Sequence, residues 1–331
     1  MEITKLALVV DSHTGGEPTR VLIGGGILHI PGESILQKRK WLKENHDFLR
    51  TFLMCEPRGH QDMYGAIVIP PTVDEADVGV IFIDPHRYAD MCGHGIIGVV
   101  TTLIQMGLVN AEPPEYKLIL DTPAGKILTR AKVENGEVKN VTFRNVPAFL
   151  YSSEEIMLKE IGNIEIDIAY GGNYFALVKS QDLGIEVIPE QISELKRLAI
   201  SIMEEANNKV EIIDPITKEK RKIDLVQIYN EESYPPRNIV AGPVKVDRSP
   251  CGTGTCAKMA MLNAREMLGI QEEYRYMSIL GTEFQGRIIQ KTVIGAEYEA
   301  IIPEVTGSAH ITGLQQLVAS KNDPFKWGFK L

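Results

Sequence analysis

Two cysteines stand at the head of matching glycine-rich segments in different halves of the chain. Cys92 lies in Met-Cys-Gly-His-Gly and Cys251 in Ser-Pro-Cys-Gly-Thr-Gly-Thr, and each precedes a segment with the pattern of a helix. A helix N-terminus stabilises a thiolate, because its unpaired backbone N–H groups and its macrodipole favour negative charge. If the two helix starts face each other, the thiols bracket one small pocket, where one sulfur takes a proton from a carbon and the other returns one to the opposite face. The alternative is two unrelated buried cysteines beside tight turns.

The glycines beside both cysteines indicate what such a pocket would hold. They let a substrate approach the helix amides closely, and the same amides bind carboxylates. An amino acid with its Cα between the two sulfurs matches this arrangement. Many enzymes that remove an α-proton use pyridoxal phosphate as the electron sink. The sequence does not exclude a lysine for that cofactor, but an opposed thiol pair makes it unnecessary, and we predict no cofactor.

Two polar residues lie close to the cysteines in the sequence. His94 follows Cys92 by two positions, and Asp247 precedes Cys251 by four. Either side chain could bind a substrate nitrogen, Asp247 as a charged acceptor and His94 as a neutral one. The alternatives are structural: His94 would bond to a nearby loop, and Asp247 would pair with Arg248 or cap a turn.

Two short motifs imitate other enzyme sites. Residues 93–98, Gly-His-Gly-Ile-Ile-Gly, match the dinucleotide-binding fingerprint, which requires a strand directly before it. Residues 85–90 intervene here, so we do not predict a Rossmann site. Asp11, Ser12 and His13 are adjacent in the sequence and therefore cannot form a catalytic triad.

The composition is that of a globular protein with two domains. The chain has 331 residues, of which 44% are hydrophobic and 24% charged, and this length exceeds one ordinary core. A net charge of −9 without a basic block argues against a nucleic-acid partner. No apolar run reaches the ~20 residues of a membrane span, and the apolar stretch at the amino terminus is too short for a secretory signal. We expect a cytoplasmic protein with no nucleic-acid or membrane partner.

Cysteine usage argues against two further kinds of site. The four cysteines are too few for a disulfide scaffold, and cytosolic thiols normally stay reduced. Neither a Cys-x-x-Cys pair nor a His-Glu-x-x-His helix occurs, so we predict no metal site.

Strand-like runs alternate with helical segments along the chain. We predict helices over residues 34–53, 93–106 and 189–207 and from Cys251 to Gly269; the second is apolar on all sides and therefore buried. Each half contains strands, an amphipathic helix, more strands, and then Cys-Gly-x-Gly opening a buried helix that stops at glycine. This order indicates an ancient duplication with a boundary near residues 130–140. The predicted strands are residues 6–10, 21–23, 66–69, 78–83, 117–120, 141–143, 166–169, 175–178, 210–213, 224–229, 287–289, 300–302 and 309–311.

Several longer motifs closely resemble those of the proline racemase family, and the resemblance covers essentially the whole chain. They are Asp-Ser-His-Thr-Gly-Gly-Glu-Pro-Thr-Arg at 11–20, Glu-Pro-Arg-Gly-His at 56–60, Asp-Met-Tyr-Gly at 62–65, Met-Cys-Gly-His-Gly at 91–95, Asp-Thr-Pro-Ala-Gly at 121–125, Tyr-Gly-Gly-Asn at 170–173 and Asp-Arg-Ser-Pro-Cys-Gly-Thr-Gly-Thr at 247–255.

The resemblance implies a mixed α+β fold like that of diaminopimelate epimerase. Such a fold has two pseudo-symmetric domains, each a curled β-sheet around a central buried helix, with the C-terminal tail returning to the first domain. We expect an N-terminal domain of residues 1–130 plus 306–331 carrying Cys92. A C-terminal domain of residues 131–305 would carry Cys251. Family members are typically homodimers, so a homodimer is expected.

The resemblance also implies roles for individual residues. Cys92 and Cys251 would be the acid–base pair of a cofactor-independent reaction. His94 and Asp247 would hold the substrate nitrogen. The substrate carboxylate would be held by backbone amides, namely those of Gly93, His94, Gly252 and Thr253.

Three activities occur in the family that these motifs resemble. Proline racemases and hydroxyproline 2-epimerases keep both cysteines, whereas trans-3-hydroxyproline dehydratases typically have threonine in place of the second. Both thiols are present here, which favours inversion at Cα of proline. Tyr64 and Ala241 match positions that shape the ring pocket, and the small Ala241 favours tolerance of 4-hydroxyproline as well. The alternatives are a trans-3-hydroxyproline dehydratase and a non-catalytic protein that binds an imino acid.

Overall fold

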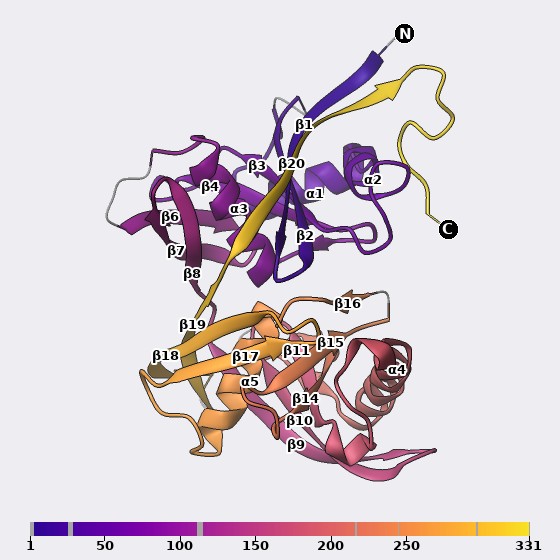
Figure 1. The fold of residues 1–331 in the computed structure, drawn as a ribbon, viewed down its shortest axis with the longest axis vertical. Coiled ribbons are helices and arrows are strands. Elements are labelled where there is room, and N and C mark those ends of the chain that lie inside the picture. Colours follow the sequence, from indigo (N-terminus) through magenta and orange to yellow (C-terminus); the bar gives the residue numbers. More distant parts are fainter. Residues whose placement is uncertain are drawn as a thin grey trace. The chain divides into compact units, whose positions relative to one another are not determined.

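The fold is α+β, with strands predominating over a few helices (Figure 1). The computed structural model describes residues 3–25, 29–110, 115–215, 217–243, 245–295 and 297–330. The chain forms two compact units, named here unit 1 (Met1–Phe143 with Ser308–Leu331) and unit 2 (Arg144–Gly307). The predicted division between residues 130 and 131 would fall inside a strand, Gly125–Glu134.

Unit 1 carries the first cysteine segment and both ends of the chain. Its elements are β1 (Ile3–Thr14), β2 (Glu17–Gly24), α1 (Ile35–Asn45), α2 (Phe48–Met54), β3 (Gly65–Ile69), β4 (Val78–Ile83), β5 (Tyr88–Ala89), α3 (Gly93–Gln105), β6 (Glu115–Thr122), β7 (Gly125–Glu134), β8 (Glu137–Arg144) and β20 (Ala309–Ser320).

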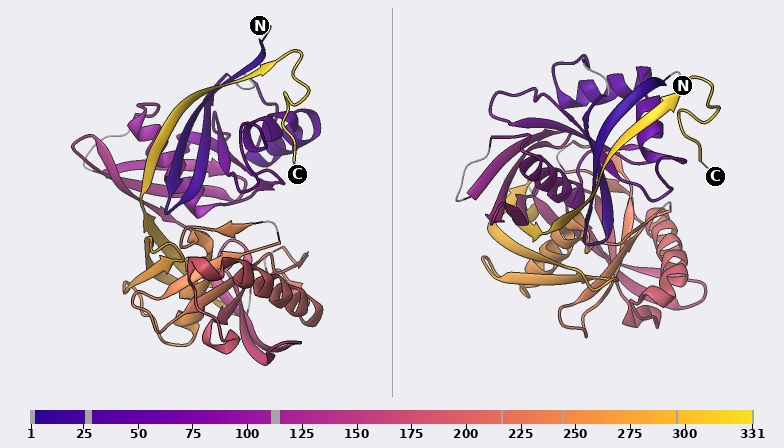
Figure 2. Two further views of the ribbon diagram at one scale, coloured as in Figure 1. Left: turned by 45° about the vertical axis from the view of Figure 1, so that its right-hand side comes forward. Right: turned by 45° about the horizontal axis from the view of Figure 1, so that its top comes forward.

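The strands of unit 1 combine antiparallel and parallel pairs. Strand β1 is antiparallel to both β2 and β20, and β2 is parallel to β3. Strand β3 is antiparallel to β4, which is antiparallel to β5 and parallel to β6; antiparallel pairs then join β6 to β7 and β7 to β8. Strand β20 lies along β1 in every view, so the end of the chain completes the unit that its beginning starts (Figure 2).

Helix α3 is the buried helix of unit 1. It packs against β1, β2, β3, β7 and β20, and its residues from Gly93 to Leu103 are all buried. A Cβ at Gly98 would lie 2.8 Å from Cβ of Thr19 on β2, so glycine permits this close approach. The helix ends at Gln105, and Gly107 follows with φ of +65°, as a glycine after a helix C-terminus commonly does.

Unit 2 carries the second cysteine segment. Its elements are β9 (Ala148–Leu158), β10 (Gly162–Tyr170), β11 (Tyr174–Lys179), the 3₁₀ turns η1 (Gln181–Leu183) and η2 (Pro189–Gln191), α4 (Ile192–Lys209), β12 (Ile212–Ile213), β13 (Lys220–Arg221), β14 (Leu225–Asn230), β15 (Arg237–Ala241), β16 (Val246–Asp247), α5 (Gly252–Ala264), β17 (Glu273–Ser278), β18 (Glu283–Ile294) and β19 (Tyr298–Gly307).

The strand pairings of unit 1 recur in unit 2. Strand β10 is antiparallel to β9 and β11, and β11 is parallel to β14. Strand β14 is antiparallel to β15, which is antiparallel to β16 and parallel to β17; antiparallel pairs then join β17 to β18 and β18 to β19. Helix α5 packs against β9, β10, β11, β18 and β19. Unit 2 therefore repeats the sequence of strand pairings of unit 1, with a buried helix after the same strand.

Three predicted helices differ from the observed ones. The helix predicted over residues 34–53 is broken, because His46 leaves the helical conformation (φ −142°, ψ 32°) and stacks on Trp41. The helix predicted from Cys251 to Gly269 ends at Ala264, since Arg265 caps it and Glu266 has φ of +59°. The helix predicted over residues 189–207 begins with the 3₁₀ turn η2 and continues as α4 to Lys209.

The strand predicted over residues 210–213 shrinks to Ile212–Ile213, because Val210 caps helix α4. Several strands were underestimated or not predicted at all, and β18 is an underestimated one. Its buried and exposed residues alternate along the first half of Glu283–Ile294, but its polar residues obscured all except residues 287–289.

One buried charge lies on helix α5. The side chain of Lys258 is 1% exposed, its Nζ is 2.7 Å from Oε1 of Glu231, and the same atom lies 3.2 Å from the ring centroid of Tyr229. Burial lowers the pKa of Lys258 to about 8, although Glu231 opposes that shift. Between this pKa and the ordinary value of 10.5, the folded chain binds fewer protons at this site than the unfolded chain. Stability therefore rises with pH across this interval.

We predict that Lys258→Met raises the free energy of unfolding at pH 7 by about 1–3 kcal/mol, because it removes a buried ammonium and keeps its stem. Glu231 is 33% exposed and also lies 4.0 Å from Lys179, so it keeps solvent and a cation. Urea unfolding between pH 7 and pH 10 measures this free energy of unfolding. In Lys258→Met it should no longer rise with pH above pH 8. Lys179→Met, which removes an exposed amine beside the same carboxylate, is the control. Equal pH slopes in wild type and Lys258→Met would contradict the assignment.

Candidate functional site

The first cysteine caps the buried helix of unit 1. Cys92 is the N-cap of α3, with extended backbone (φ −154°, ψ 115°), and it is 9% exposed. Its Sγ accepts a hydrogen bond from the Gly95 amide at 3.4 Å, and its carbonyl accepts one from the Ile96 amide at 3.0 Å. The thiol therefore occupies the place of an ordinary capping oxygen, where helix amides favour its thiolate form.

His94 is held on both sides at the same helix start. Its Nδ1 lies 3.2 Å from Sγ of Cys92, and its carbonyl accepts a hydrogen bond from the Thr14 hydroxyl at 3.0 Å. The ring packs edge-on against Tyr64, with 4.7 Å between centroids. The structure thus brings His94 directly to the thiol, while its main chain bonds to the last residue of β1.

Tyr64 forms an aromatic wall beside Cys92. Its ring contacts both His94 and Phe82, and burial followed by the neighbouring Cys92 raises the pKa of its hydroxyl well above 10, so the phenol stays protonated. A Cβ at Gly95 would lie 3.0 Å from the Phe82 ring and 3.2 Å from that of Tyr64. Glycine at this position lets both rings pack against the first turn of α3.

The second cysteine caps the buried helix of unit 2 in a different backbone conformation. Cys251 is the N-cap of α5, and its Sγ accepts a hydrogen bond from the Gly254 amide at 3.4 Å and lies 3.6 Å from Oγ1 of Thr253. Its φ is +65°, which non-glycine residues seldom adopt. The Cys251 carbonyl accepts hydrogen bonds from the amide and hydroxyl of Thr255, at 2.8 and 2.7 Å.

Asp247 lies at the end of β16 and is partly buried. Its Oδ1 accepts hydrogen bonds from the amide and hydroxyl of Ser249, at 2.9 and 2.7 Å. Asp247 therefore does cap a turn, which was one of its two structural alternatives. Burial raises the pKa of Asp247, and the Ser249 donors and Lys245 oppose the shift.

Two causes dominate the pKa of the Cys251 thiol, and both raise it. Burial first, and then the Asp247 carboxylate, raise the pKa of the Cys251 thiol well above its ordinary value of 9.0. The Gly254 amide and Thr253 act in the opposite direction. Cys251 therefore carries its proton at neutral pH.

The predicted carboxylate-binding amides occupy equivalent places in the two units. Gly93 and His94 open α3, and Gly252 and Thr253 open α5. The first amides of a helix have no acceptor within the helix, and a bound anion can supply one. Each unit thus has one helix start that combines a thiol with the amides predicted to bind the carboxylate. The assignment of a carboxylate to these amides stays a prediction.

Ala241 lies at the end of β15, opposite Val226 and Val246, and its side chain belongs to the hydrophobic core of unit 2. In the strand pairing of unit 1, Ile83 occupies the same place, at the end of β4 and opposite Gly65 and Tyr88. A role of Ala241 in shaping a ring pocket stays a prediction.

Sequence reasoning missed three polar residues that contact these helix starts. Thr14 and Ser249 lie inside the quoted motifs, but which groups their hydroxyls contact was not readable from the pattern. Gln227 is fully buried, and its Nε2 donates to Oδ1 of Asn238 at 3.1 Å. A Cβ at Gly254 would lie 2.9 Å from that Nε2 and 3.2 Å from Sγ of Cys251. A glutamine between the apolar residues Val226 and Ile228 was the available signal.

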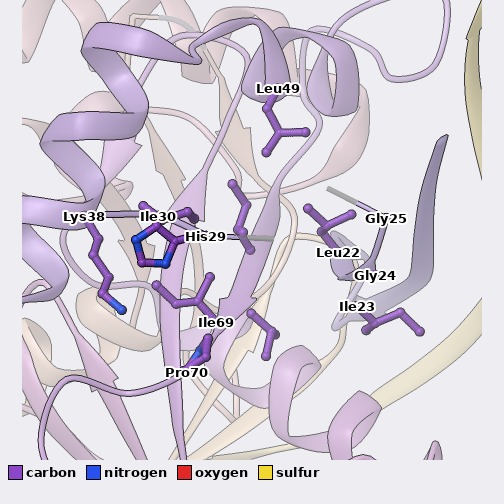
Figure 3. A pocket seen from close by; sticks show the side chains of 12 residues that line it. Leu22, Ile23, Gly24, Gly25, His29, Ile30, Lys38, Leu49, Ile69 and Pro70 are labelled. Atoms are coloured by element: carbon purple, nitrogen blue, oxygen red, sulfur yellow. The ribbon is translucent and has the colours of Figure 1, made fainter. Parts of the chain in front are cut away.

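Two hollows among the described residues have no cysteine in their lining, and one of them, of about 210 Å³ in unit 2, is lined by residues that include Tyr151, Asp214 and Lys218. The other, of about 240 Å³ in unit 1, has mainly apolar walls from β2 and β3, with His29 and Lys38 at its edge (Figure 3). Within the residues that the structure describes, no three histidine, cysteine, aspartate or glutamate side chains gather as a metal site would require. None of the helices in that part of the chain combines the length and apolarity of a membrane span.

Comparisons with known proteins agree with the motifs. The family model described as proline racemase matches residues 9–330. A proline racemase from Clostridioides difficile is 43% identical over 336 residues, covering 100% of both chains. A trans-3-hydroxy-L-proline dehydratase from Bacillus cereus is 36% identical over 335 residues, also covering 100% of both. A solved hydroxyproline epimerase from Agrobacterium vitis, with bound trans-4-OH-L-proline, matches at a TM-score of 0.90 and 29% identity, covering 100% of this chain and 97% of that one.

We predict that Asp247→Asn accelerates alkylation of Cys251 by iodoacetamide at pH 8 by about three- to tenfold, because removing a nearby negative charge lowers the thiol pKa. Mass spectrometry of the separate cysteine peptides gives the rate, and Cys92 in the same molecule is the internal reference. Glu232→Gln, an exposed acidic residue of unit 2, is the control. Unchanged or slower alkylation of Cys251 in Asp247→Asn would show that the carboxylate does not hold the thiol in its protonated form.

Proposed function

The chain belongs to the proline racemase family, and from this premise we propose that it is a cofactor-independent racemase or epimerase that inverts Cα of proline and also accepts 4-hydroxyproline. Family membership confirms the predicted enzyme class, an amino-acid isomerase. The observation that carries the proposal is the presence of two thiols, Cys92 and Cys251, each capping a buried helix and each accepting an amide hydrogen bond at 3.4 Å.

In the proposed reaction, the helix starts of the two units enclose one substrate. The amides of Gly93, His94, Gly252 and Thr253 hold its carboxylate, and this contact strengthens as negative charge develops on the carboxylate side of Cα. Asp247 and His94 hold the ring nitrogen. Held this way, the substrate has its Cα between the two sulfurs, with the α-hydrogen toward one of them.

The proton moves in one direction per turnover. One sulfur, as thiolate, takes the α-proton, and the C–H electron pair becomes carbanion character at Cα. The other sulfur, as thiol, delivers its proton to the opposite face and becomes the thiolate. The substrate gains and loses one proton, so only the configuration at Cα and the protonation of the two sulfurs change.

The local environments support different resting states for the two sulfurs. Burial and Asp247 raise the pKa of Cys251, so it begins as the thiol. The sulfur of Cys92 lies 3.2 Å from Nδ1 of His94 and accepts the Gly95 amide, and both groups can donate to a thiolate. In the proposed reaction Cys251 would thus start as the acid.

Two observations bear on the substrate. Residue 251 is cysteine, which provides a proton donor on the second face, where the dehydratases typically have threonine. The solved epimerase contains trans-4-OH-L-proline and shares the fold over the whole chain. These favour inversion over dehydration, and they favour acceptance of a 4-hydroxyl beside Tyr64.

The same proposal includes the architecture and setting of the enzyme. The recurring strand pairings support two pseudo-symmetric domains that arose by duplication, in a fold of the diaminopimelate epimerase kind. We further propose that the enzyme is a cytoplasmic homodimer.

We predict that wild type incorporates deuterium at Cα of L-proline in D₂O and forms D-proline, as followed by NMR and chiral chromatography. Cys92→Ala and Cys251→Ala should each lower inversion by about 10³-fold or more, since removing one member of a group that acts as a unit removes most of the rate. Cys55→Ala and Cys256→Ala are matched controls, because both cysteines are buried and neither is the N-cap of a helix.

The same assay with other ring substrates separates the alternatives. Inversion of trans-4-hydroxy-L-proline supports the broader substrate range. A ketimine-derived product from trans-3-hydroxy-L-proline, without inversion of proline, would mean a dehydratase. Binding of L-proline without deuterium at Cα would mean a binding protein, and either result would overturn the proposal.

A further inference from the structure

One buried hydroxyl connects the predicted nitrogen-binding carboxylate to the second thiol. Ser249 is fully buried, and its Oγ donates to Oδ1 of Asp247 at 2.7 Å. The same Oγ accepts a hydrogen bond from the backbone N–H of Cys251 at 3.1 Å. The Ser249 amide donates to Oδ1 of Asp247 as well, at 2.9 Å.

This pair of bonds requires a group that donates and accepts at once. A carboxylate only accepts and a backbone N–H only donates, so the bridging atom must do both, and a hydroxyl does. The amide and the hydroxyl of Ser249 both donate to Oδ1 of Asp247. These two bonds fix the orientation of the carboxylate group and therefore the direction of its other oxygen, Oδ2. Pro250 follows Ser249 and restricts its backbone to extended conformations. Formation of the bridge therefore costs little conformational entropy.

The bridge also stabilises an unfavourable backbone conformation. Cys251 has φ of +65°, in a region where a non-glycine residue is strained. Its N–H, bound to Ser249, and its carbonyl, bound twice to Thr255, are the contacts that hold it there. Cys92 has an ordinary extended backbone at the corresponding helix start of unit 1. The second thiol therefore depends on its surroundings in a way that the first does not.

We propose that Ser249 is a positioning residue that sets the direction of the Asp247 carboxylate and the backbone of Cys251 together through its one hydroxyl. The inference deepens the proposed function, because Asp247 is there the group that holds the substrate nitrogen. Ser249 itself does not contact the substrate. Its effect reaches the ring nitrogen through Asp247 and the Cα proton through Cys251.

Paired ligands test the contribution through Asp247. Cyclopentanecarboxylate has the ring size and carboxylate of proline but no nitrogen, so it does not use Asp247. Ser249→Ala should weaken equilibrium binding of L-proline about tenfold, the usual effect of a lost hydrogen bond to a charged group, and should leave cyclopentanecarboxylate within about twofold. Ser249→Thr keeps the hydroxyl and should restore proline binding to within about threefold of wild type. Equal losses for both ligands, or no loss, would overturn the proposal.

Thiol reactivity tests the contribution through Cys251 and does not require racemase activity. In Ser249→Ala we expect the ratio of Cys251 to Cys92 alkylation by iodoacetamide to change by at least about threefold, with Ser249→Thr close to wild type. Ser233→Ala is a control, because its hydroxyl bonds only to the backbone of its own loop. If wild type neither binds nor inverts proline, the proposed function fails while this ratio still tests the bridge. An unchanged ratio in a folded Ser249→Ala protein would show that Ser249 does not position the thiol.

Discussion

The hydrogen bond from a helix amide to a cysteine sulfur is the constraint on which the rest of the structure depends. It occurs twice, from Gly95 to Cys92 and from Gly254 to Cys251, at 3.4 Å in both cases. A sulfur can take this place only at the first turn of a helix, and each such turn is here surrounded by strands. Where strands and loops approach these buried helices closely, only glycine fits. Gly98 lies against Thr19, and Gly171 lies against the carbonyl of Thr253. The strands fix each helix in position, and the helix fixes the sulfur.

The two units use the same framework with different surroundings for the sulfur. Beside Cys92 lie the rings of Tyr64 and His94. The second sulfur has a carboxylate and a hydroxyl among its neighbours, since Ser249 and Asp247 precede it, and the amide of Gln227 packs against Gly254. In the proposed reaction this asymmetry has a use, because a ring with one apolar and one charged side can bind in a single orientation. A symmetric pair of half-sites would not distinguish the nitrogen of the substrate from its methylene groups.

The sequence predicted the helix starts well because several local signals agreed there. Glycines, an apolar run and a cysteine coincide at residues 92–106, and the observed helix Gly93–Gln105 follows them closely. The break at His46 was not predictable from the heptad spacing of Ile35, Leu42 and Leu49, since all three are buried on either side of it. Strand β18 was underestimated because polar residues alternate with its buried ones. The Ser249 bridge depends on a positive φ at Cys251, which no periodic pattern in the sequence reports.

Burial of the second thiol creates an electrostatic conflict that a substrate would resolve. An ionised Asp247 raises the pKa of Cys251 because two negative charges would then lie close together in a buried place. The ring nitrogen of proline is cationic at neutral pH, and bound to Asp247 it would cancel much of that repulsion. The pKa of the Cys251 thiol would then fall as the substrate binds, at the moment when its proton is needed at Cα. In the free enzyme the same thiol keeps its proton, so Cys251 would become a stronger acid only with the substrate beside it. In the proposed reaction Asp247 would thus act on the sulfur as well as on the nitrogen, and the Ser249 bridge would hold the carboxylate in place for both.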